Sequence, residues 1–241
     1  MEPEKPDFII GIPIYQGVDL LDVAAPYEIF NWMGEYWNNA RELKVYLVAE
    51  TNVALLTRDG LQLVPHKNFD QVPRLDVLWV PGGDPSALTK KMADPTFLDF
   101  LTTRSDGAVY VASVCEGALL LASAGLLDGY CATTHWAFIP CLKKRFPKVE
   151  VADGYPRFVL DDRHGTERGM RMTGGGISSG LDEALELVRR IAGEEVAQQV
   201  QLVTQYFPDP PVRADLAKQV ETLKKEGKYC CPIWPDQCEG K

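Results

Sequence analysis

Short, almost fully apolar segments recur along the 241-residue chain, and stretches with helical periodicity separate most of them. Clear examples are Phe8–Tyr15, Leu43–Glu50, Leu75–Gly83 and Gly107–Val114. Strands that are apolar on both faces belong to parallel sheets covered on both sides, and strand–helix alternation is typical of α/β proteins. The sequence therefore predicts an α/β fold with a mostly parallel sheet and helices on both faces.

Two hairpin patterns, over Val53–His66 and Arg157–Gly176, add antiparallel strand at an edge of this sheet. Helical patterns include 178–192, where Ser178 and Ser179 are the expected caps, and 194–206. No linker interrupts the chain before its last residues. We therefore expect a single domain over 1–226 and a cysteine-containing tail over 227–241, with Cys230, Cys231 and Cys238.

The formal net charge of -9 argues against nucleic acid as a partner. No apolar run has the roughly 18 residues that a bilayer requires, so no membrane partner is expected. The N-terminal apolar run is short and broken by Pro13, which makes a poor signal peptide. These features predict a cytoplasmic protein whose six cysteines are thiols.

Cys115 lies where an apolar strand ends and a helical pattern begins. In open α/β sheets, ligands bind at the carboxyl ends of the strands. The free amides and the dipole of a helix start favour a thiolate, and small neighbours such as Ala112 and Gly117 fit a tight strand-to-helix turn like a nucleophile elbow. We predict that Cys115 is a nucleophile rather than a structural cysteine. For Cys131 and Cys141, which have no such setting, we predict a structural role.

Three further residues are candidates for the same site. Gly82 and Gly83 close the strand expected beside the cysteine strand, and their amides would form an anion-binding nest; the alternative is a turn that needs glycine conformations. His135 follows a short extended segment and is the expected base or hydrogen-bond partner of the thiol. The pattern alone does not select a carboxylate among 34 acidic residues.

Four motifs, "VPGG", "ASVCEGALLLASAGLLDG", "ATTHWA" and "GGISSGLDEALELVRRIAG", resemble the ThiJ/PfpI superfamily and its isonitrile hydratase-like branch. The resemblance extends from about Phe8 to Pro211 and implies a flavodoxin-like three-layer sandwich. It also implies that Cys115 is the nucleophile and that Asp22, in "GVDLLDVAAPYEIF", is its acidic partner. Asp19 and Glu28 nearby are expected to be solvated or to support the helix.

The same resemblance places the amide of Gly83 opposite the sulfur and His135 near it.

One residue departs from the branch, in which a threonine follows the cysteine in the form "CTGALLLA"; this chain has Glu116. An unpaired carboxylate there would raise the pKa of the thiol, and Asp22 and Glu116 would then form a pair that shares a proton. Relatives that regulate transcription carry a C-terminal helix-turn-helix module. Only about thirty residues follow the region of resemblance here, which is too few for such a module, so we do not expect a regulator of this kind.

The resemblance implies an enzyme in which the Cys115 thiolate attacks an isonitrile carbon and Asp22 donates the proton, giving an N-substituted formamide. No metal and no cofactor are expected. The alternatives are a glyoxalase III-like or deglycase-like activity on α-oxoaldehydes, and a redox-sensing or ligand-binding module without catalysis. The expected partners are a small electrophilic substrate and a second copy in a homodimer, although Trp32, Trp37 and Trp136 fit a core equally well.

Overall fold

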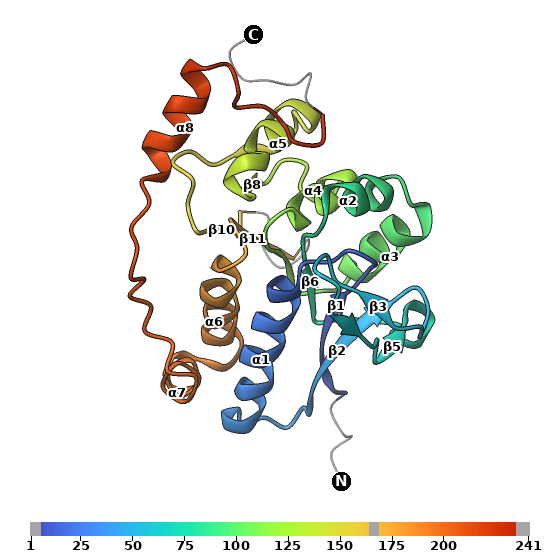
Figure 1. Cartoon of the computed structure of the whole chain (residues 1–241). Helices are drawn as coiled ribbons and strands as arrows, with labels where there is room; N and C mark the ends of the chain where they lie inside the picture. Colours follow the sequence, from blue (N-terminus) through green and yellow to red (C-terminus); the bar gives the residue numbers. More distant parts are fainter. Residues whose placement is uncertain (1–5, 164–168, 235–241) are drawn as a thin grey trace.

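A seven-stranded sheet forms the centre of the computed structural model, which describes residues 6–163 and 169–234 (Figure 1). The strand order is β10-β11-β7-β6-β1-β2-β5. These strands are β1 (Phe8–Pro13), β2 (Leu43–Ala49), β5 (Lys67–Asn68), β6 (Val77–Val80), β7 (Tyr110–Ser113), β10 (Phe158–Asp161) and β11 (Met170–Gly174). Cys238 of the predicted tail lies outside the described residues.

All neighbouring strands of this sheet are parallel except the edge pair β10 and β11, which is antiparallel. The other predicted hairpin forms a separate two-stranded unit of β3 (Leu55–Leu56) and β4 (Gln62–Leu63). A further short parallel pair consists of β8 (Cys131–Ala132) and β9 (Glu150–Val151). The predicted mostly parallel sheet is confirmed.

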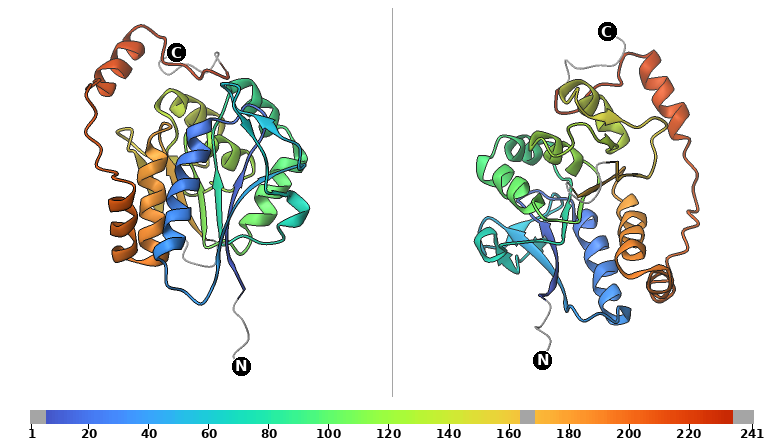
Figure 2. Two further views of the ribbon diagram at one scale, coloured as in Figure 1. Left: turned by 60° about the horizontal axis from the view of Figure 1, so that its bottom comes forward. Right: turned by 180° about the vertical axis from the view of Figure 1, so that it is seen from behind.

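Helices cover both faces of the sheet (Figures 1 and 2). One face carries α1 (Leu20–Tyr36), α6 (Ser179–Ala192) and α7 (Glu194–Val203), and the other carries α2 (Pro85–Met92), α3 (Pro95–Ser105) and α4 (Gly117–Ser123). The remaining helices are α5 (Ile139–Arg145), α8 (Leu216–Lys225) and the short 3-10 turns η1 (Phe69–Gln71) and η2 (Trp136–Phe138). This arrangement confirms the three-layer, flavodoxin-like sandwich.

Two details of the predicted helices are wrong. The Ser178 side chain does not cap α6; its hydroxyl instead accepts a 3.4 Å hydrogen bond from Arg157 Nη1. The helix predicted over 194–206 ends at Val203, because the backbone turns left-handed at Gln205, with φ 51°.

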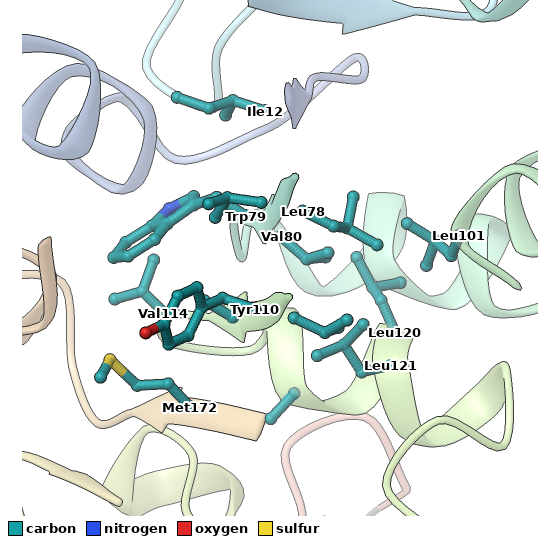
Figure 3. Packing of buried hydrophobic residues seen from close by; sticks show 14 of the residues in the cluster. Ile12, Leu78, Trp79, Val80, Leu101, Tyr110, Val114, Leu120, Leu121 and Met172 are labelled. Atoms are coloured by element: carbon teal, nitrogen blue, oxygen red, sulfur yellow. The ribbon is translucent and has the colours of Figure 1, made fainter. Parts of the chain in front are cut away.

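The core lies on both sides of β6 and β7, whose residues alternate between the faces (Figure 3). Trp79, Val114 and Met172 pack together on the side of α1 and α6, and each is fully buried. Leu120 and Leu121 of α4 lie on the other side with Val80. Both strands are therefore apolar on each face, as the sequence predicts, and their carboxyl ends are held in fixed positions.

The chain after α7 runs along the molecule to α8 and then returns to α5 (Figure 1). There Cys231 forms a disulfide with Cys141 of α5, with Cα atoms 4.8 Å apart. The prediction that all cysteines are thiols is therefore wrong for this pair. The two residues are 90 positions apart, and only the folded chain brings them together.

Over the described ranges, no helix combines the length and the hydrophobicity needed to cross a bilayer.

Candidate active site

Cys115 lies on a strained turn between β7 and α4. Its backbone is left-handed, with φ 55°, a conformation that non-glycine residues adopt rarely and at a cost of about 1–3 kcal/mol. Its N–H donates to Gly175 O at 2.8 Å and its carbonyl accepts from Thr134 Oγ1 at 2.7 Å. A side chain at Gly117 would collide with the carbonyl of Val80. The local structure is thus the tight elbow that the small residues around Cys115 predict.

Four buried side chains meet at this turn. Ligating atoms of Asp19, Asp22, Cys115 and Glu116 all lie within 4.8 Å of one another. Asp19 and Asp22 come from the start of α1, where the spacing of three residues places them on the same side of the helix. The predicted acidic partner Asp22 therefore lies with the thiol, whereas Asp19, expected to be solvated, is only 3% exposed and belongs to the same cluster.

Gly82 lies against two carboxyl groups of the cluster, those of Asp22 and Glu116. Its N–H donates to Asp22 Oδ2 at 2.8 Å, and a side chain at this position would collide with Glu116 Oε2. The amide of Gly82 is therefore occupied by Asp22, so the expected nest of two free amides is not formed. The Gly83 N–H contributes to lowering the pKa of Glu116, and so faces that carboxyl group.

Two residues that sequence reasoning missed complete the surroundings. The Tyr15 hydroxyl is fully buried and donates a 3.2 Å hydrogen bond to Pro81 O. Burial raises its pKa well above the usual value, and the charges of Glu116, Asp22 and Asp19 raise it further. Arg58, in the turn between β3 and β4, has Nη1 3.2 Å from Asp19 Oδ1. The hairpin pattern locates Arg58 on a turn, but nothing in the local sequence indicates that this turn reaches the start of α1.

Burial is the largest cause of the pKa shifts in the cluster. It raises the pKa of Asp22 well above its usual value, and the charge of Glu116 raises it further, whereas the Gly82 N–H lowers it. Burial raises the pKa of Glu116 to about 7, although contact with the Cys115 thiol lowers it. These carboxyl groups therefore hold protons at a higher pH than exposed acids do.

The thiol itself is shifted in the direction opposite to the prediction. Burial raises the pKa of Cys115 well above its usual value, and the charges of Asp22 and Glu116 raise it further. The helix α4 has only seven residues, and Cys115 is 1% exposed. The expectation of a resting thiolate at a helix start is therefore wrong, because desolvation and two neighbouring carboxyl groups outweigh the helix dipole.

His135 is not part of the four-residue cluster. Its Nδ1 accepts a 3.3 Å hydrogen bond from Ala137 N, and its ring contacts Gly176. Burial lowers its pKa, which favours the neutral imidazole. Among the described residues, no hydrogen bond joins it to Cys115, so it stays a neighbour of the site, linked to the elbow through the hydroxyl of Thr134.

A buried cysteine on a strand-to-helix elbow, set among carboxyl groups at the carboxyl end of a parallel sheet, defines a class of α/β proteins with a cysteine–carboxyl cluster at the end of a strand. The chain matches the model of the DJ-1/PfpI family over residues 10–172, and it belongs to this family.

Several relatives extend the match. An isonitrile hydratase of Pseudomonas putida is 38% identical over 202 residues, which cover 84% of this chain and 80% of that protein. The HTH-type transcriptional regulator GbdR of Pseudomonas aeruginosa is 30% identical over 58% of this chain but only 35% of its own length. The crystal structure of a ThiJ/PfpI family protein from Pseudomonas syringae has a TM-score of 0.75 and 30% identity, with 92% and 88% of the two chains covered.

Drosophila melanogaster DJ-1beta, at 18% identity and a TM-score of 0.67 over 83% of this chain and 98% of that one, shares the fold.

Proposed function

We propose that the chain is a cysteine-dependent hydratase that converts an isonitrile and water into an N-substituted formamide. The observation that carries this proposal is that the Cys115 sulfur lies within 4.8 Å of oxygen atoms of two buried carboxyl groups, Asp22 and Glu116, whose pKa values are raised. Hydration of an isonitrile adds both a nucleophile and a proton to one carbon. A nucleophile beside a protonated acid meets that requirement.

The first step joins the sulfur to the isonitrile carbon. Because the thiol is neutral at rest, a base must take its proton as the S–C bond forms, and Glu116, next in the chain and in contact with the thiol, is placed to do so. Asp22, as the acid, gives its proton to the same carbon. The product is a thioimidate, R–N=CH–S–Cys115, with Glu116 protonated and Asp22 ionised.

The second step adds water across the C=N bond. Ionised Asp22 takes a proton from water, whose oxygen bonds to the carbon, while Glu116 protonates the nitrogen. The tetrahedral adduct then expels the sulfur, which regains a proton from the hydroxyl group as the formamide C=O forms. One water is consumed, and both carboxyl groups and the thiol return to their starting protonation.

Glu116 thus has a role that a threonine at this position would not fill. A hydroxyl group cannot accept the thiol proton near neutral pH, whereas a carboxyl group with a pKa of about 7 exchanges protons readily there. The 38% identity to the Pseudomonas putida isonitrile hydratase supports the reaction class.

Incubation with cyclohexyl isonitrile in water enriched in oxygen-18 tests the proposal. We expect N-cyclohexylformamide with one labelled oxygen, formed by the natural chain and by the control Cys131→Ser, whose free, half-buried thiol lies away from the site. Cys115→Ser should be inactive. Equal formamide production by Cys115→Ser would contradict the proposal. Consumption of methylglyoxal instead of the isonitrile would favour α-oxoaldehyde chemistry, and consumption of neither would favour a sensor.

We also propose that two copies associate through the outer side of α1. An apolar hollow there is bordered by Leu21, which is 41% exposed and directly precedes Asp22 in the chain. Its apolar lining comes from Leu21, Ala24, Ala25, Ile29, Leu181 and Tyr206. Light scattering should give the mass of a dimer for the natural chain and of a monomer for Leu21→Asp. Leu202→Asp, on the exposed side of α7, is the matched control; a natural chain that is monomeric would overturn this proposal.

A further inference from the structure

The cluster at the elbow has an unusual set of ligating atoms for a site that needs no metal in the proposed reaction. It combines one sulfur with three carboxyl groups, all at most 5% exposed, within 4.8 Å of one another. They come from the start of α1 and from the turn after β7, two elements that the sheet holds rigidly.

Two oxygen atoms in this cluster have no hydrogen-bond partner. Asp22 Oδ1 and Glu116 Oε2 are buried and unpaired, although Asp22 Oδ2 accepts from Gly82. A buried polar atom without a partner is costly, and buried charges in proteins are paired or coordinate metal ions. These two atoms therefore point to a ligand that accepts electron pairs from both.

The charges of the cluster are also poorly balanced. Among the described residues, Arg58 is the one cation with an ion pair to any of the four. Of the four it pairs only with Asp19, and its own side chain is 43% exposed and also pairs with Asp59. Asp22 and Glu116 face no cation in an ion pair within the described ranges. Either protons or a cation must neutralise them.

We propose that Cys115, Asp22, Glu116 and Asp19 bind a divalent transition-metal ion of the zinc type. A thiolate with carboxylates suits Zn²⁺ or Co²⁺, whereas Ca²⁺ and Mg²⁺ require more oxygen ligands and no sulfur. Binding forms the metal–sulfur and metal–carboxylate bonds as the protons of the Cys115 thiol and of Asp22 leave to solvent. The ion then occupies the electron pair that would attack a substrate, so it acts as an inhibitor that competes with the electrophile. Only this consequence rests on the proposed function.

Titration with Co²⁺ tests the site without any substrate. We expect one equivalent to bind, with a sulfur-to-cobalt charge-transfer band in the near ultraviolet that Zn²⁺ abolishes by displacement. The protein is kept oxidised so that the disulfide between Cys141 and Cys231 stays intact.

Four variants locate the ion. Cys115→Ser should lose the band, and Glu116→Gln should weaken cobalt affinity by more than about tenfold. Cys131→Ser and Glu28→Gln, the second with an exposed carboxyl group on α1 outside the cluster, should bind as the natural chain does. Circular dichroism of each variant confirms that it is folded.

Absence of a band at stoichiometric cobalt would overturn the proposal, as would equal affinity in Cys115→Ser or a band that depends on Cys131. Because the band is recorded without substrate, a failure here is distinguishable from a failure of the hydratase proposal. If the site binds Zn²⁺, formamide production should be inhibited competitively and restored by a chelator.

Discussion

Glu183 is a fully buried carboxyl group on α6 whose two oxygen atoms have no hydrogen-bond partner. It packs against Gly174 at the end of β11. Burial raises its pKa well above the usual 4.5, and the charge of Asp22 raises it further. Below pH 4.5 both the folded and the unfolded chain hold this proton. As the pH rises above 4.5, the unfolded chain releases the proton and the folded one keeps it, so stability falls until the pH passes the folded-state pKa.

The expected size follows from proton linkage. Each pH unit between the two pKa values lowers the free energy of unfolding by about 1.4 kcal/mol. Glu183→Gln removes the titration and keeps the shape. The variant should therefore gain stability relative to the natural chain by about 1.4 kcal/mol per pH unit above pH 5, and the pH at which this gain levels off measures the folded-state pKa.

Urea unfolding monitored by tryptophan fluorescence, in half-unit steps from pH 5 to pH 8, measures this difference. Glu186→Gln, one turn away on the same helix, is the matched control. Hydrogen bonds from Arg189 and Arg190 lower the pKa of Glu186, so its contribution is fully present above pH 4.5, and the difference for this variant should be independent of pH from pH 5 to pH 8. A pH-independent difference for Glu183→Gln, or one that shrinks as the pH rises, would refute the reasoning.

Three further predictions concern the disulfide and the site. Cys231→Ser opens the disulfide to Cys141, which spans 90 positions, and should lower the free energy of unfolding by up to about 4.5 kcal/mol in urea titrations; an unchanged midpoint would contradict this. Glu116→Gln removes a charge that raises the pKa of Cys115, so iodoacetamide should alkylate that thiol faster at pH 7 while formamide production falls about 100-fold or more. Arg58→Met removes a cation that lowers the pKa of Asp22, the proposed proton donor, so the donor stays protonated to higher pH and the basic limb of the pH–rate profile should move to higher pH.

Most of the sheet and the position of Cys115 follow from local patterns. The segment Gly107–Val114 is apolar on both faces because helices cover both, and its abrupt end at Cys115 marks the elbow. Asp22 could be identified as the acidic partner only from the family motif, since the chain has 34 acidic residues with the same chemistry. Arg58 could not be predicted, because its role depends on where the β3–β4 turn lies relative to α1, a tertiary contact without a local signal.

The burial of Glu183 could not be predicted from the sequence either. A glutamate in the second turn of an amphipathic helix fits the positive N-terminal end of the helix dipole, and no local pattern indicates that this side chain packs against Gly174. Likewise, the pairing of Cys141 with Cys231 depends on the return of the chain from α8 to α5.

The chemistry of the elbow is decided by how many charges its small volume can hold. One amide, that of Gly82, stabilises Asp22, and one half-exposed guanidinium, that of Arg58, stabilises Asp19. A thiolate would add another negative charge beside Glu116 without another donor, which is why the sulfur keeps its proton at rest. In the proposed hydration, the first step would therefore move that proton within the cluster as the S–C bond forms, so that the total charge stays constant. In that proposal Glu116, directly after the cysteine, is the acceptor at the shortest possible distance along the chain.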